Sequence, residues 1–230
     1  MKVRSFVEYL LAIFLILGMV SWKTSTPKIF LVGDSISIFY GPYLKTFMEG
    51  QAELEQKAIE TLEGRTFSRN GGDSRRVLDY LKAKLIQPGF HPDYLLLNCG
   101  LHDIGRDTIR HDLQVPLDTY RKNLDSIFSL IQAKKIKIIW VTTTPVVDSI
   151  HNSRTKVKQR YSKDLEEYNQ AAAVVCKRYH VRVIDLHDFT RTLGPDAYLD
   201  NVHYKEEIRP QQAAYIAGSL RIILDENASK

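Results

Sequence analysis

The chain has 230 residues, 44% of them hydrophobic, which is enough for one sizeable core, and nothing in the composition requires a second domain. The formal net charge of +5 comes from basic and acidic residues that are interspersed, and no recognisable nucleic-acid-binding motif accompanies it, so no nucleic-acid partner is expected. The two cysteines, Cys99 and Cys176, exclude a disulfide framework and a C-x-x-C metal site. We expect both to be buried as small apolar side chains, with a pairing between them as the alternative.

The first 23 residues have the layout of an export segment. Basic Lys2 and Arg4 precede an uninterrupted apolar run at residues 10–20, which is short for a membrane span of roughly 20 residues. A cleaved signal peptide is therefore favoured, and the lack of an A-x-A cleavage sequence leaves an uncleaved membrane anchor as the alternative. We predict a linker at 24–27, one domain at 28–230, and action outside the cytoplasm, with the protein secreted, periplasmic or tethered to a membrane.

Short apolar runs alternate with segments in helical spacing along the rest of the chain. Runs so apolar are typical of strands buried on both faces of a parallel sheet. The predicted strands lie at 28–32, 94–98, 136–141 and 181–185, with a weaker one at 53–58, and the helical faces lie at about 77–85, 117–131, 161–179 and 210–224. This alternation predicts an α/β fold, a three-layer α/β/α sandwich with about five parallel strands.

Small polar residues follow the predicted strands. Gly33-Asp34-Ser35 follows the first strand, Gly72 follows the second strand and its loop, and His102-Asp103 follows the third. Ligands of open parallel sheets bind beyond the carboxyl ends of the strands, so these motifs are expected at one edge.

These residue types suit a serine hydrolase. A serine hydroxyl needs a base to take its proton, and a carboxylate to orient that base. We assign Ser35 as the nucleophile, His203 as the base and Asp200, three residues earlier, as the orienting carboxylate. The N–H groups of Ser35 and Gly72, with the His102 side chain, are the candidate donors to the oxyanion.

The same motifs resemble those of the SGNH hydrolases, the GDSL esterases and lipases, over about residues 28–225. Gly33-Asp34-Ser35, Asn70-Gly71-Gly72-Asp73-Ser74 and Asp200-Asn201-Val202-His203 match the family's blocks. The third block departs from them, because Gly100-Leu101-His102-Asp103 carries histidine where the family has asparagine. A neutral histidine still has one ring N–H to donate.

The resemblance implies a flavodoxin-like SGNH fold and an exported serine esterase that needs no cofactor or metal. Together with the export segment and the basic stretch His151–Lys163, it suggests an acylated carbohydrate as substrate, with acetyl as the acyl group. Another small ester is the alternative substrate. A lipase, a thioesterase, an acyltransferase and an inactive carbohydrate-binding protein are the alternative functions.

Each motif also has a purely structural interpretation. Gly-Asp-Ser is a common turn, Asp73 or Ser74 is placed to cap a helix, and His102 suits the end of a strand. We assign Asp34 and Asp103 supporting roles through hydrogen bonds. No ligand spacing supports a metal site built from Asp34, His102, Asp103 and His203. The basic stretch is either a solvated loop and helix start or a contact for an acidic polysaccharide or a membrane surface, and the other histidines are expected at the surface or in loops.

Overall fold

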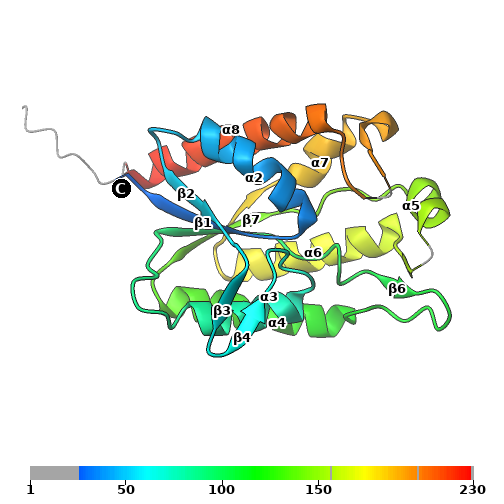
Figure 1. Ribbon diagram of the computed structural model, residues 1–230, viewed down its shortest axis with the longest axis horizontal. Helices are drawn as coiled ribbons and strands as arrows, with labels where there is room; N and C mark the ends of the chain where they lie inside the picture. Colours follow the sequence, from blue (N-terminus) through cyan, green and yellow to red (C-terminus); the bar gives the residue numbers. More distant parts are fainter. Residues whose placement is uncertain (1–25, 156, 201, 229–230) are drawn as a thin grey trace, which may run out of the picture.

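The computed structural model describes residues 26–155, 157–200 and 202–228. Within these residues, five strands form a parallel sheet in the order β2-β1-β5-β7-β9 (Figure 1). The strands are β1 (Lys28–Val32), β2 (Glu53–Gln56), β5 (Tyr94–Leu97), β7 (Lys137–Val141) and β9 (Arg182–Ile184). This order is that of flavodoxin-like folds, and it confirms the predicted parallel sheet.

Helices cover both faces of the sheet, which confirms the three-layer prediction. One layer holds α2 (Ser35–Phe47), α7 (Leu186–Arg191) and α8 (Arg209–Ala228). The opposite layer holds α3 (Ser74–Lys84), α4 (Leu117–Ala133) and α6 (Ser162–Arg178), packed side by side (Figure 1). Because β1, β5 and β7 lie between the layers, nearly all of their residues are buried, whereas the edge strands β2 and β9 are partly exposed.

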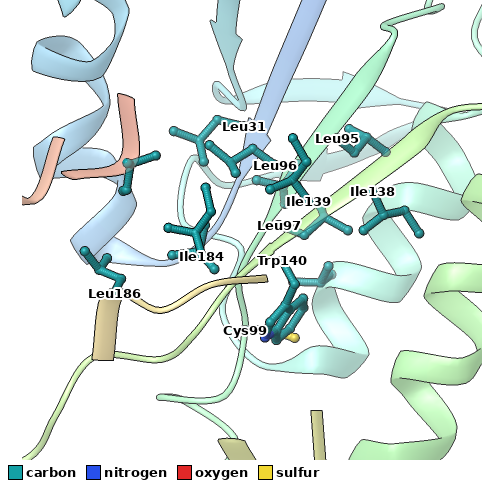
Figure 2. Packing of buried hydrophobic residues seen from close by; sticks show 14 of the residues in the cluster. Leu31, Leu95, Leu96, Leu97, Cys99, Ile138, Ile139, Trp140, Ile184 and Leu186 are labelled. Atoms are coloured by element: carbon teal, nitrogen blue, oxygen red, sulfur yellow. The ribbon is translucent and has the colours of Figure 1, made fainter. Parts of the chain in front are cut away.

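The core lies between the sheet and these helices. Figure 2 shows Leu96, Leu97, Ile139 and Trp140 clustered where the central strands run side by side. Both cysteines are buried and free, as expected for small apolar side chains.

Several short elements were not predicted. An antiparallel hairpin of β3 (Glu60–Leu62) and β4 (Arg65–Phe67) turns through Glu63 and Gly64, both at positive φ. A second antiparallel pair joins β6 (Arg106–Asp107) to β8 (Lys158–Gln159), next to α5 (Asp148–Arg154). Two 3₁₀ turns, Pro195–Ala197 and Glu206–Ile208, complete the secondary structure of the described residues. These segments are short and highly charged, so they carry no apolar periodicity.

The export segment predicted at 1–23 lies outside the described residues, as does the start of the linker. In the part of the chain that the structure describes, no helix has the length and apolar character needed to cross a membrane.

Candidate active site

The site lies where the carboxyl ends of the strands meet the loops that follow them. Ser35 is the first residue of α2, directly beyond β1. Gly71 joins the same edge because its N–H donates to the Gly33 carbonyl at 2.9 Å. The segment that carries Asp200 and His203 arrives from the other end of the chain, just before α8.

Ser35, His203 and Asp200 form a hydrogen-bonded chain. The His203 Nε2 atom lies 2.9 Å from the Ser35 Oγ atom, and the His203 Nδ1 atom lies 2.7 Å from the Asp200 Oδ2 atom. The other carboxylate oxygen of Asp200 accepts the N–H groups of Val202 at 2.9 Å and His203 at 2.8 Å. Asn201, which lies between Asp200 and Val202 in the sequence, is outside the described residues. The short Asp-x-x-His spacing thus folds the carboxylate back onto the ring that it orients.

The charges around Ser35, His203 and Asp200 suit the transfer of a proton from the serine hydroxyl to the histidine. Burial pushes the pKa of Asp200 upward, but the two backbone N–H groups and the His203 ring outweigh it, and the net pKa lies below the usual value. An ionised Asp200 holds the Nδ1 proton of His203, so the Nε2 lone pair faces the Ser35 hydroxyl. The Phe39 ring packs edge-on against His203, with the ring centroids 5.2 Å apart, and limits the rotation of the imidazole.

Asp34 and Gly33 hold the serine in place. Asp34 is buried and caps α2, its Oδ1 atom accepting the Ile36 N–H at 2.9 Å. A Cβ atom at Gly33 would lie 2.8 Å from the Ser37 Oγ atom, which is too close. The contacts of Asp34 are thus those of a helix cap.

Gly72 has a backbone conformation that favours glycine, but its N–H already has a partner. The residue lies at φ +73°, where L side chains are strained. Its N–H donates to the Asn70 Oδ1 atom at 2.8 Å. The donor assigned to the oxyanion is therefore paired with a neighbouring carboxamide in this structure.

His102 is a partly buried imidazole whose surroundings lower its pKa. Burial lowers the pKa of His102, and the nearby guanidinium groups of Arg160 and Arg76 lower it further, against the opposing charges of Asp34 and Asp73. No hydrogen bond joins its ring to another of the described residues. A neutral ring has one N–H to donate, so the chemistry predicted for this position is available.

Asp103 and Asp73 fasten the neighbouring loop to α3. Both carboxylate oxygens of Asp103 lie 3.0 Å from the Ser74 N–H, and burial raises the pKa of Asp103 to about 7. Asp73 is the N-cap of α3, accepting the N–H groups of Arg75 and Arg76 at 3.1 and 3.2 Å. Burial pushes the pKa of Asp73 upward, but hydrogen bonds from Gln114 and Arg75 outweigh it and leave the pKa low. Both acids have structural contacts.

Two arginines of the basic stretch support the site loops, which the sequence did not reveal. Arg154 donates to the Asp200 carbonyl at 2.8 Å, and Arg160 donates through Nε to the Leu101 carbonyl at 2.6 Å. The stretch is therefore more than a solvated loop. The expectation that His151 lies at the surface or in a loop is wrong, because it is buried in helix α5 with its Nε2 atom 3.1 Å from the Lys158 carbonyl.

Among residues 26–155, 157–200 and 202–228, no group of three or more histidine, cysteine, aspartate or glutamate side chains is arranged to hold a metal ion. The chemistry that the site offers comes from a serine hydroxyl, an oriented imidazole and N–H donors.

Comparisons with known proteins show which family the chain is similar to. The model of the GDSL-like lipase/acylhydrolase family matches residues 31–209. No curated protein matches the sequence significantly.

Solved structures share the fold at low sequence identity. An acetyl xylan esterase, AlAXEase, is 17% identical with a TM-score of 0.63, covering 84% of this chain and 98% of that one. A lipase/acylhydrolase from Enterococcus faecalis is 19% identical with a TM-score of 0.62, covering 84% and 95%. The psychrotrophic esterase EstA from Pseudoalteromonas sp. is 16% identical with a TM-score of 0.61, covering 86% and 98%.

Proposed function

The chain belongs to the GDSL-like lipase/acylhydrolase family, and from this premise we propose that it is a serine esterase that removes a small acyl group, acetyl in the first instance, from a carbohydrate. The observation that carries the proposal is the chain of hydrogen bonds from Asp200 through His203 to Ser35, at 2.7 and 2.9 Å. We place its action outside the cytoplasm because of the apolar run behind Met1–Arg4.

The reaction proceeds through an acyl-enzyme. The Ser35 oxygen attacks the ester carbonyl carbon while its proton moves to the Nε2 atom of His203. When the ester C–O bond breaks, His203 gives that proton to the departing sugar oxygen. Water then attacks the acyl group with His203 again as the base, releasing the carboxylic acid and restoring Ser35. One water is consumed, and the acid and the alcohol are the products.

Three groups are the candidate donors to the oxyanion. The Ser35 N–H, at the start of α2, has no acceptor within the helix, and His102 has one ring N–H. The Gly72 N–H joins them when the Asn70 carboxamide releases it to the substrate. The Gly72 N–H would then exchange the Asn70 oxygen for the substrate oxygen as its acceptor.

One observation supports a carbohydrate as the alcohol of the ester, and another supports a small acyl group. One structural neighbour is an acetyl xylan esterase. The sequence also has no long, purely apolar insertion of the kind that would line a channel for a fatty acyl chain. A lipase would need such a channel, so a small acyl group fits the chain better.

Hydrolysis of p-nitrophenyl acetate by the purified protein and its Ser35→Ala variant tests the proposal. We expect the variant to lose about 10⁴-fold or more in kcat. Ser219→Ala, a serine on α8 whose hydroxyl bonds the Tyr215 carbonyl at 3.0 Å, is the matched control and should keep full activity.

A second comparison tests the acyl group and the alcohol. Acetate esters should be cleaved faster than octanoate esters, and acetylated xylo-oligosaccharides should release acetate. Equal background rates for wild type and Ser35→Ala would contradict the esterase. They would favour a carbohydrate-binding protein that retains the fold, for which the paired Gly72 N–H and the histidine at 102 would be signs of lost activity. Net transfer to an added alcohol would instead indicate an acyltransferase.

A further inference from the structure

A small cavity with basic walls lies beside the candidate active site. Its volume is about 140 Å³, and we call it the basic cavity. The polar and charged residues that line it include Lys57, Arg65, Ser68, Asn70, Arg76 and Asp79. Its walls come from the residue after β2, the β3–β4 hairpin, the loop that follows the hairpin and the first turns of α3.

Lys57 is buried and forms no ion pair with a carboxylate of the described residues. Lys57 is only 3% exposed. Its Nζ atom donates a hydrogen bond to the Ser68 carbonyl and lies 4.3 Å from the centroid of the Tyr80 ring. The nearby Glu60 carboxylate is already occupied, accepting Lys84 and the Tyr80 hydroxyl at 2.6 Å each. An ammonium has three N–H donors, so Lys57 has capacity left for another acceptor.

The burial of Lys57 disfavours its charged form. Burial lowers its pKa to about 8, and the positive charges of Arg76 and Lys84 add to this effect against the opposing charge of Glu60. A buried cation is normally paired, because an unpaired charge in a protein interior is unfavourable. An anion bound in the basic cavity would provide the missing partner.

Two further cations line the basic cavity without ion pairs. Neither Arg65 nor Arg76 lies within ion-pair distance of a carboxylate in the described residues. Arg76 donates through Nη2 to the Ser68 Oγ atom at 3.2 Å. Asp79 contributes one negative charge to the lining, so the three cations leave the cavity positive.

Arg76 connects the basic cavity to the reaction centre. A Cβ atom placed on Gly72 would lie 2.9 Å from the Arg76 Cδ atom and 3.2 Å from its Nη1 atom, so this side chain lies directly against the oxyanion glycine. Gly71, which lines the cavity, bonds the Gly33 carbonyl two residues before Ser35. A group bound in the basic cavity would therefore lie close to the oxyanion glycine.

We propose that the basic cavity is a subsite for an anionic group of the substrate, a carboxylate, sulfate or phosphate on the same carbohydrate that carries the ester. The inference deepens the proposed function and rests on it. A cavity of about 140 Å³ is smaller than the roughly 300–1,000 Å³ of sites that enclose a whole small molecule, so it accommodates one substituent. Lysine and arginine donors give strong, charge-assisted hydrogen bonds to such a group.

Binding to the Ser35→Ala protein tests the subsite without needing turnover. Calorimetric titration would compare methyl β-D-glucuronide, glucose 6-sulfate and glucose 6-phosphate with neutral methyl β-D-glucoside. We expect at least one anionic sugar to bind about tenfold or more tightly than the neutral one. The identity of the tightest probe distinguishes a carboxylate from a sulfate or phosphate. Equal or absent binding for all four sugars would overturn the subsite, whatever the esterase activity.

Charge-removing variants locate the binding. In the Ser35→Ala background, Arg65→Gln and Lys57→Gln should each remove most of the preference for the anionic sugar. Arg65 is exposed and its replacement should not impair folding, which keeps the test valid if Lys57→Gln fails to fold. Lys82→Gln, an exposed lysine of α3 outside the cavity lining, is the matched control and should leave the preference intact. A preference that survives Arg65→Gln, or that is lost equally in Lys82→Gln, would contradict the assignment.

Kinetics separate this inference from the proposed function. In the protein with Ser35 intact, kcat/KM should be about tenfold higher for an acetylated methyl glucuronide than for the acetylated methyl glucoside. The ratio of the two kcat/KM values is therefore expected to be about ten. Arg65→Gln should bring the ratio close to one. Hydrolysis of both esters at a ratio of one in the wild type would retain the esterase and reject the subsite. Anion binding without hydrolysis of any ester would retain the subsite and reject the esterase.

Discussion

Replacing Asp103 by asparagine should remove a large part of the pH dependence of stability. Asp103 has no exposed surface, and burial raises its pKa from 3.8 to about 7. The folded protein therefore binds this proton more tightly than the unfolded chain does. The stability that the proton contributes is complete below about pH 4 and is lost as the pH rises to about 7.

The structure sets the magnitude of the effect. A pKa difference of about three between the folded and unfolded states corresponds to about 4 kcal/mol, or about 1.4 kcal/mol per pH unit across the interval. Asparagine does not titrate and keeps one oxygen to accept the Ser74 N–H, which Asp103 accepts at 3.0 Å. The free energy of unfolding of Asp103→Asn should therefore rise relative to wild type by up to about 4 kcal/mol between pH 4 and 7.

Urea denaturation at a series of pH values measures this difference directly. Asp73→Asn is the matched control because its pKa is lowered in the folded protein and asparagine is also a good N-cap. The contribution of Asp73 is present above its unfolded pKa and lost as the pH falls, so Asp73→Asn should lose stability relative to wild type as the pH rises. A difference for Asp103→Asn that is independent of pH, or that has the sign expected for Asp73→Asn, would refute the reasoning.

Three further predictions concern catalysis and use kinetics with p-nitrophenyl acetate. His102→Asn should keep substantial activity while His102→Ala loses about a hundredfold to a thousandfold, and equal rates for wild type and alanine would reject the oxyanion role. Gly72→Ala, at φ +73° and 2.9 Å from the Arg76 Cδ atom, should lose about 1–2 kcal/mol of stability and most activity. The control Gly64→Ala, at φ +75° in open space, should lose stability alone. Asp200→Asn should lower kcat by about 10⁴-fold, since asparagine favours the wrong imidazole tautomer, and unchanged kcat would contradict this.

The sheet could be predicted because its central strands are buried on both faces. Such strands must be apolar throughout, so β1, β5 and β7 are visible as uninterrupted runs in the sequence. The hairpin of β3 and β4 could not be predicted in this way. Each of its strands has three residues, and most of their side chains are exposed or only partly buried. With so little burial, no periodicity distinguishes a hairpin from a loop.

The proposed catalytic residues could be predicted from the sequence for two different physical reasons. Asp200 and His203 are close in the chain, so a single turn brings their side chains together. Ser35 is remote from both, and its meeting with His203 follows from the parallel order of the strands, which places all carboxyl ends at one edge. The bond between the Gly72 N–H and Asn70 depends on one side-chain rotamer, which no sequence pattern specifies.

Charge along the chain was a poor guide to charge in space. The run from His151 to Lys163 is a long basic stretch without an acidic residue, yet Arg154 and Arg160 donate hydrogen bonds to backbone carbonyls of the site loops. Lys57, Arg65 and Arg76 come from separate stretches with acidic residues between them, so they form no run. They meet at one cavity because the connection from β2 through the hairpin to α3 folds back on itself. In a parallel α/β fold such connections converge at the catalytic edge, so cations that matter for substrate binding need not be neighbours in the sequence.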